Sequence, residues 1–156
     1  MGYSWDSKYN EEDGKTTLDK EDDAAYVIWG KSCRMPTNAQ FEELCQECSW
    51  VWTSKLSSDG SHTYGYAVKS KTNDNVIFLP AGGKISTYVD NGEISEPYND
   101  YDDEEGFYLS CSIAGYENYL EISGLQFWDG KIHVWDDFRR WEGCSIRPVA
   151  ERAQDY

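Results

Sequence analysis

Apolar residues at helical spacing mark the first structured segment of this chain. The stripe lies over residues 24–28, and Thr17 upstream is suited to accept hydrogen bonds from the free backbone N–H groups at a helix start. Acidic side chains at 19–23 favour the positive end of the helix dipole, and Gly30 is suited to follow the last turn. The pattern predicts a helix over about residues 18–29.

A second helix is predicted over about residues 38–47. Thr37 and Gln40 have the spacing of a capping box, in which each side chain bonds the backbone N–H of the other residue. The apolar positions that follow also keep helical spacing. They are Phe41, Leu44, Cys45 and Cys48.

Beyond residue 49 the apolar spacing changes to the alternation of β-strands. Turns are expected at 57–61 and 72–75, and the uninterrupted apolar run 76–79 is typical of a strand buried on both faces. The expected strands cover about residues 49–53, 64–68, 76–79, 85–89, 107–113, 119–122, 132–135 and 145–149.

The order of these elements predicts the fold class. Two helices followed by many short strands indicate an α+β fold. The length suits a single domain, residues 1–156, with residues 1–15 as a loose arm or an edge strand. The segment between Asp90 and Gly106 is expected to be an acidic loop.

The formal net charge of −15 limits what this chain can bind. Nucleic acid and anionic membranes attract Lys and Arg, so neither is expected as a partner. No apolar run approaches the ~20 residues that cross a bilayer, and the chain does not open with a signal-peptide pattern. Solubility explains most of such acidity, and a basic partner or a cation is the functional alternative.

The five cysteines, an odd number, cannot all pair within one molecule. They are expected to be small buried apolar side chains, with disulfides as the second interpretation and a redox or zinc site as the third. Cys45 and Cys48 form a Cys-x-x-Cys pair, but it lies at the end of a predicted helix, whereas a helix start would lower the thiol pKa. Neither His62 nor His133 has the spacing of a zinc ligand.

Catalytic motifs are not found around the two histidines, and no cofactor or metal is predicted. Ser-His-Asp sets and carboxylate pairs are not constrained by spacing, so a hydrolase stays as a rival class. The preferred interpretation is that the chain is not an enzyme.

Several strings, in order along the chain, resemble one known family. They are Asp13-Gly14-Lys15-Thr16-Thr17-Leu18, Glu21-Asp22-Asp23-Ala24-Ala25, Trp29-Gly30, Arg34-Met35-Pro36-Thr37, Phe41-Glu42-Glu43-Leu44, Cys48-Ser49-Trp50-Val51-Trp52-Thr53, Ile77-Phe78-Leu79-Pro80-Ala81-Gly82-Gly83 and Ser145-Ile146-Arg147-Pro148-Val149. The chain is similar to the Fibrobacter succinogenes major paralogous domain over about residues 13–83 and 106–149. The resemblance implies a C-type-lectin-like fold, with two helices packed on a twisted antiparallel sheet, close termini and long loops. It also implies a cell-surface or secreted location.

The resemblance suggests a rigid frame around a segment that can differ. Arg34 and Arg147 stand beside prolines and are expected to be partly buried, since their five donors each can tie loop carbonyls together. Arg147→Ala is therefore expected to cost more stability than Arg139→Ala. The frame residues are Trp29, Arg34, Pro36, Trp50, Trp52, Phe78, Pro80, Arg147 and Pro148.

Calcium binding, common among lectins, is the metal-dependent alternative. Residues 96–100 and 135–137 resemble lectin strings, but Tyr98 interrupts the first and Asp136 replaces an amide in the second. A solvated acidic loop without calcium is the preferred interpretation.

Residues 107–144 form the candidate variable binding segment, because the stretch 111–144 hardly matches the family. Domains of this fold in gut bacteria and their phages can be variable proteins of diversity-generating retroelements. With 7 Trp and 12 Tyr in the chain, aromatic residues interleaved with charges favour recognition. The expected binding residues are Tyr116, Tyr119, Trp128, Asp129, Trp135, Asp136, Asp137, Arg139, Arg140 and Trp141.

These patterns together predict a ligand-recognition domain of a gut-bacterial or phage surface protein. Its ligand is an unknown protein or glycan. A structural or adhesin module without a pocket of its own, and a glycan-binding lectin, are the alternatives.

Overall fold

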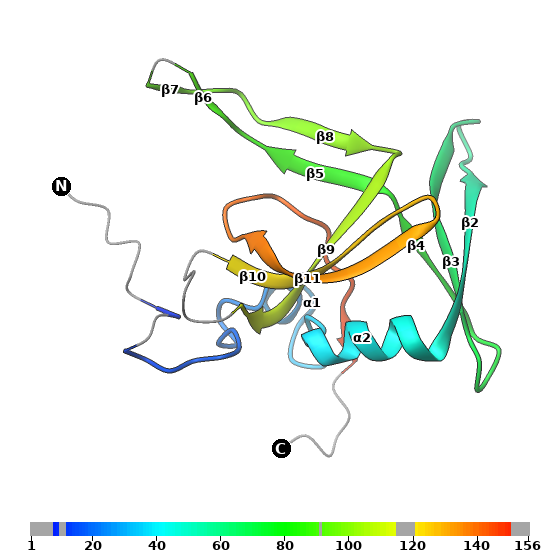
Figure 1. The fold of residues 1–156 in the computed structure, drawn as a ribbon, viewed down its shortest axis with the longest axis horizontal. Helices are drawn as coiled ribbons and strands as arrows, with labels where there is room; N and C mark the ends of the chain where they lie inside the picture. Colours follow the sequence, from blue (N-terminus) through cyan, green and yellow to red (C-terminus); the bar gives the residue numbers. More distant parts are fainter. Residues whose placement is uncertain (1–7, 10–11, 91, 115–120, 151–156) are drawn as a thin grey trace.

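The computed structural model describes residues 8–9, 12–90, 92–114 and 121–150 and shows an α+β fold in which β-sheet predominates (Figure 1). The helices are α1 (Ala24–Trp29) and α2 (Asn38–Glu47). The strands are β1 (Cys33–Arg34), β2 (Cys48–Leu56), β3 (His62–Ser70), β4 (Val76–Pro80), β5 (Gly82–Ser86), β6 (Val89–Asp90), β7 (Glu93–Ile94), β8 (Tyr98–Asp102), β9 (Glu105–Ile113), β10 (Glu121–Trp128), β11 (Lys131–Arg139) and β12 (Val149–Ala150). Within the described ranges, no helix is long and apolar enough to span a membrane.

The described strands form sheets in the orders β11-β10-β9-β5-β8, β2-β3-β4, β1-β12 and β6-β7. Paired strands run antiparallel, except that β5 meets β9 in parallel at Gly83 and Gly106. In Figure 1, α2 lies below β10 and β11, and the β2-β3-β4 sheet stands at one end of the molecule. The β5–β8 ribbon, with its β6–β7 tip, extends away from the rest of the domain.

The main core fills the space between α2, the β2-β3-β4 sheet and one face of β9–β11. Phe127 is fully buried at its centre. Its ring contacts Tyr66 edge-on at 5.4 Å and lies nearly parallel to Tyr108 at 5.8 Å. Trp50 and Trp52 pack against the same ring. Aromatic burial of this extent dominates core energetics, so β10 is held firmly against the second sheet.

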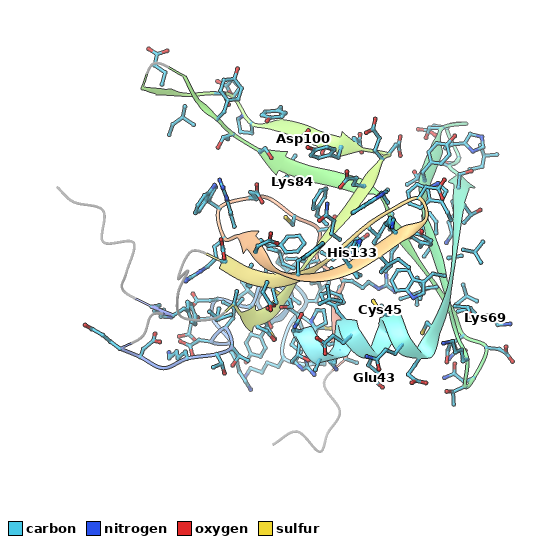
Figure 2. The ribbon with its side chains drawn as sticks, viewed as in Figure 1. Glu43, Cys45, Lys69, Lys84, Asp100 and His133 are labelled. Atoms are coloured by element: carbon cyan, nitrogen blue, oxygen red, sulfur yellow. The ribbon has the colours of Figure 1, made fainter. Side chains whose placement is uncertain are left out.

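The predicted second helix is confirmed at both ends. The Thr37 side chain accepts from the Gln40 N–H at 3.2 Å, and the Gln40 side chain accepts from the Thr37 N–H at 3.0 Å. Figure 2 shows Cys45 pointing from α2 toward the sheets and Glu43 pointing away, as the apolar spacing requires. Phe41 is the buried anchor of this helix.

The first helix was predicted six residues too long. Its N-cap is Asp23, whose side chain accepts from the Tyr26 N–H at 3.0 Å. Thr17 instead forms a bridge with Ser112, and the Leu18 N–H donates to the Cys111 carbonyl at 2.8 Å. These residues satisfy their backbone groups by pairing beside β9, so they do not need a helix.

Residues 8–9 and 12–15, the described part of the predicted loose arm, are tied to the body. Tyr9 is buried, its hydroxyl donates to Asp22, and it accepts from the Asp19 N–H at 2.9 Å. Lys8 pairs with Asp22 at 2.7 Å, and Lys15 pairs with Asp19. The acidic residues expected at a helix start therefore hold this arm.

Two predictions were wrong, one of a strand buried on both faces and one of an acidic loop. Val76 is 58% exposed, because β4 is an edge strand with one face in solvent and is not buried on both faces. The expected acidic loop after Asp90 contains β7 and β8, so it is largely a ribbon. Glu93 of β7 and Asp102 of β8 are on exposed strand positions, where charges protect an edge against unwanted pairing.

Other strand boundaries moved. The strand predicted at 85–89 divides into β5 and β6, and β10 runs on to Trp128, well beyond residue 122. Of the strand predicted at 145–149, Val149 belongs to β12, while Ser145 makes an isolated bridge to Tyr108.

The two arginines of the predicted frame differ. Arg34 is half-buried and donates to the Met35 carbonyl at 3.0 Å and to Gln40 Oε1 at 2.8 Å, as expected. Arg147 is exposed, so the expectation that it is partly buried is wrong. This removes the physical reason for ranking Arg147→Ala above Arg139→Ala in lost stability. Trp29, also placed in the frame, is 51% exposed.

Candidate functional site

Alternation along β9, β10 and β11 divides their side chains between two faces of the sheet. Leu125 and Phe127 point into the main core, with Tyr108 beside them from β9. On the other face, Gln126 is the cross-strand partner of Phe107 and His133. This second face carries the candidate site.

Three aromatic side chains form a continuous row on that face. The ring centroids of Trp128 and His133 are 5.3 Å apart, and those of His133 and Trp135 are 4.9 Å apart. The planes are tilted by 35° and 31°. Trp135 is 42% exposed, and His133 and Trp128 are half-buried. The stacking orders all three rings, so a ligand would find a largely preformed surface.

The turn between β10 and β11 fixes one end of the aromatic row. Trp128 pairs with Lys131 across the two-residue connection Asp129-Gly130. The buried Tyr66 hydroxyl donates to the Trp128 carbonyl at 3.1 Å and accepts from the Gly130 N–H at 2.9 Å. The core of the molecule thereby holds the turn, while the exposed Asp129 stays on its outside.

A β-bulge shapes the other end of the row. Gly124 pairs with Trp135 and Ile122 pairs with Phe138, so two residues of β11 oppose Ser123 alone. An extra residue reverses the alternation beyond it, and Phe138 therefore reaches the same side as Phe107, with ring centroids 6.3 Å apart.

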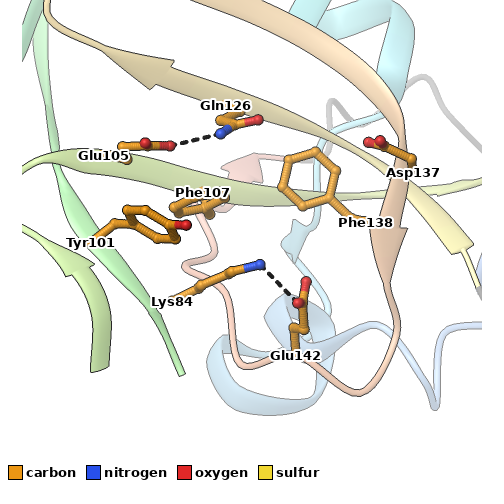
Figure 3. A pocket seen from close by; sticks show the side chains of 8 residues that line it. All are labelled: Lys84, Tyr101, Glu105, Phe107, Gln126, Asp137, Phe138 and Glu142. Atoms are coloured by element: carbon orange, nitrogen blue, oxygen red, sulfur yellow. Dashed lines mark hydrogen bonds and ion pairs between the residues drawn. The ribbon is translucent and has the colours of Figure 1, made fainter. Parts of the chain in front are cut away.

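Beside the row lies a pocket of about 230 Å³ (Figure 3). Phe107 and Phe138, both buried, and the more exposed Tyr101 supply its apolar surface. The polar residues that line it are Lys84, Glu105, Gln126, Asp137 and Glu142.

Two polar pairs organise the pocket. Lys84 Nζ donates to Glu142 Oε1 at 2.7 Å, and both side chains are at least four-fifths buried. The same ammonium lies 5.2 Å from the centre of the Phe107 ring, in cation–π geometry. Gln126 Nε2 donates to Glu105 Oε2 at 2.7 Å. Figure 3 shows both contacts across the pocket.

The structure brings together only some of the predicted binding residues. Trp128 and Trp135 form the row with His133, and Asp137 lines the pocket. Asp136 accepts from the Ser123 hydroxyl at 2.6 Å and so belongs to the bulge.

The basic residues predicted for the site lie apart from this arrangement. Arg139 is stacked over the exposed Trp141 at 5.4 Å. Arg140 is half-buried, lies over the Tyr9 ring at 5.5 Å, and donates to the Tyr9 carbonyl at 3.3 Å. Burial lowers the pKa of Arg140. Arg140 therefore secures the N-terminal arm. Tyr116 and Tyr119 lie outside the described residues.

Sequence reasoning missed most of the pocket. Its lining comes from β5, β8, β9, β10, β11 and the segment after β11, which no local spacing connects. The signal that was present is the alternation around Gln126 and His133, which places them on the face opposite Leu125 and Phe127. The missed residues are Lys84, Tyr101, Glu105, Phe107, Gln126, His133, Phe138 and Glu142.

The cysteines are free thiols. Cys111 is buried, and Cys45, Cys48 and Cys144 pack against hydrophobic clusters, as expected for small apolar side chains. Burial raises the pKa of Cys45 to about 11 and that of Cys144 to about 12. Among the residues that the structure describes, no three His, Cys, Asp or Glu side chains gather as metal ligands.

Comparison with protein-family models, with curated proteins and with solved structures gave no match to this chain.

Proposed function

We propose that this chain is a ligand-recognition domain that binds across the aromatic row and into the adjoining pocket. The observation that carries the proposal is their continuity. Trp135 ends the row, and Asp137, two residues along the same strand, lines the pocket. A ligand that covers one therefore reaches the other.

The physical character of this surface favours binding. Large rings that are already stacked lose little rotamer freedom on contact, so more of the contact energy contributes to affinity. The pocket adds polar groups held in fixed geometry by Lys84–Glu142 and Gln126–Glu105 contacts. Apolar area together with a few ordered polar groups is typical of ligand sites. The proposal includes no catalytic step.

The resemblance to the Fibrobacter succinogenes major paralogous domain forms part of the proposal, together with the C-type-lectin-like fold and the surface location. The two helices and the antiparallel pairing of β1 with β12 support it. Under this proposal Leu125 and Phe127 do not vary between related proteins, because both side chains are fully buried in the core.

The proposed variation would fall on the other face of the same strands, at positions such as Gln126, His133 and Trp135. Sequencing the genomic locus tests this part. A neighbouring reverse transcriptase and an imperfect template repeat matching 107–144 are expected. Absence of both would remove diversification from the proposal and leave recognition in place.

A combined glycan and protein array tests the recognition function itself. The wild-type domain is expected to bind at least one probe, and Trp135→Ala/Asp137→Ala is expected to lose it. Trp29→Ala, an exposed Trp on α1, is the matched control and should bind as the wild type does. A wild-type domain that binds nothing, or binding that survives the double substitution, would contradict the proposal.

A further inference from the structure

We propose that the pocket takes an uncharged, hydroxyl-rich ring, a hexose unit of a glycan, and binds it without a metal ion. The inference rests on the proposed recognition function and specifies the ligand. It follows from the hydrogen-bonding capacity, the charge and the aromatic surface of the pocket.

Acceptors outnumber donors in the pocket. Glu105 accepts from Gln126 through Oε2, and Glu142 accepts from Lys84 through Oε1. Among the described residues, the second oxygen of each carboxylate has no hydrogen-bond donor, and neither does the exposed carboxylate of Asp137. A carboxylate accepts through both oxygens. These free acceptor oxygens suit a ligand that supplies hydrogen-bond donors, as sugar hydroxyls do.

The charge of the pocket disfavours anions. Three carboxylates, those of Glu105, Asp137 and Glu142, face one ammonium, which is already paired. A uronic, sialic, sulfated or phosphorylated group would add negative charge at short range, in a chain of net charge −15.

A cationic ligand is disfavoured by Lys84. Its ammonium occupies the position over Phe107 that a ligand ammonium would need, and it neutralises Glu142. A second ammonium at the same ring would meet like charge in a half-enclosed space. Lys84 thus blocks a ligand cation at the Phe107 ring and at Glu142, while Glu105 and Asp137 remain as acceptors for a donor-rich ligand.

The aromatic surface suits the apolar face of a sugar ring. Tyr101 is 44% exposed and lies 5.9 Å from the buried Phe107. Aromatic faces carry partial negative charge and attract weakly positive C–H groups. The volume of about 230 Å³ is below the ~300–1,000 Å³ of sites for larger ligands, which indicates room for a single ring.

A glycan array with neutral, sialylated and sulfated members, together with a Lys-rich peptide, tests the inference. Neutral glycans are expected to bind, and calorimetry with the best one should give equal affinity at low and high salt and with EDTA. The inference would be overturned if only charged glycans or only the peptide bound. It would also be overturned if the affinity for the neutral glycan fell steeply with added salt or fell in EDTA.

Two variants test the roles assigned to individual side chains. Asp137→Asn replaces a carboxylate acceptor and should lower the affinity for the neutral glycan roughly tenfold. Glu43→Gln, on the outer side of α2, should leave that affinity unchanged. Lys84→Met removes the internal ammonium and should create binding of tetramethylammonium, whereas the wild type should not bind it. Unchanged glycan affinity in Asp137→Asn, or tetramethylammonium binding by the wild type, would contradict the inference.

The two proposals fail in different ways. A charged or protein ligand that is lost in Trp135→Ala would overturn the sugar and keep the recognition site. A neutral glycan that binds equally well to Trp135→Ala would contradict the composite site itself.

Discussion

Ser123, a buried residue of β10, donates its hydroxyl to the exposed Asp136 of β11 at 2.6 Å. This contact spans the β-bulge, which lies between Trp135 of the aromatic row and Phe138 of the pocket. Asp137 and Phe138, which follow Asp136 on β11, both line the pocket. One hydrogen bond thus secures the junction of the two halves of the proposed site.

Ser123→Ala should destabilise the domain by about 1–2 kcal/mol, since a hydrogen bond to a charged acceptor is lost at a buried position. Urea unfolding measures it. Ser61→Ala is a suitable control, because Ser61 donates to Asp59 at 2.7 Å in an exposed turn and should cost less. Equal losses in the two variants would mean that the bulge contact has no special role.

Gly106→Ala should destabilise the domain by about 1–3 kcal/mol or more, as overpacking does. A Cβ at this position would lie 2.2 Å from the Phe127 ring, which is fully buried and cannot move aside. Gly82→Ala serves as the control, since its Cβ would come no closer than 3.8 Å to Ser145 Oγ. A thermal melt in which both variants match the wild type would show that the core tolerates the added methyl group.

Three of the five thiols, those of Cys45, Cys111 and Cys144, should be slow to react in the native protein. Burial raises the pKa of Cys45, Cys111 and Cys144, and the thiolate is the reactive form. A thiol-reactive dye at pH 8 is expected to label these residues slowly, and all five thiols should react in guanidinium without reductant. A count of three or fewer under denaturing conditions would indicate a disulfide.

Stability should fall in alkaline solution. Burial raises the pKa of Cys45 from 9.0 to about 11 and that of Tyr108 from 10.0 to about 12. Below pH 9 these groups are protonated in both the folded and the unfolded chain. As pH rises from 9 toward 12, the unfolded chain loses protons that the folded chain keeps, so the unfolded state gains stability. The free energy of unfolding in urea is expected to be lower at pH 10 than at pH 7.

A substitution tests whether these buried groups are the cause. Cys45→Ala should reduce the drop between pH 7 and pH 10, because one of the titrating groups is gone. An unchanged free energy of unfolding in the wild type over this range would contradict the expectation.

Local signals predicted some elements well. The start of the helix over Asn38–Glu47 matched because Thr37 and Gln40 bond each other's backbone, a device that acts within four residues. The start of α1 could not be found in the same way. Thr17 resembles a cap in sequence, but it pairs with Ser112, nearly a hundred positions along the chain.

The candidate site was only partly predictable. Trp135 and Asp137 stood out because aromatic and charged residues alternate around them. Lys84 and Glu142 approach each other only because the Ile85 and Gly143 backbones exchange two hydrogen bonds, at 2.7 and 2.9 Å. The spacing of apolar residues does not indicate the bulge at Asp136. Its effect on the direction of the adjoining side chains is therefore visible only in the three-dimensional structure.

Two-dimensional NMR of the tryptophan indole N–H groups tests the central claim most directly, with whichever ligand the array identifies. Binding on the proposed face should shift the Trp128 and Trp135 signals and leave Trp29, Trp50 and Trp52 unchanged. Shifts confined to Trp29, or a bound state in which Trp128 and Trp135 do not respond, would place recognition elsewhere on the molecule.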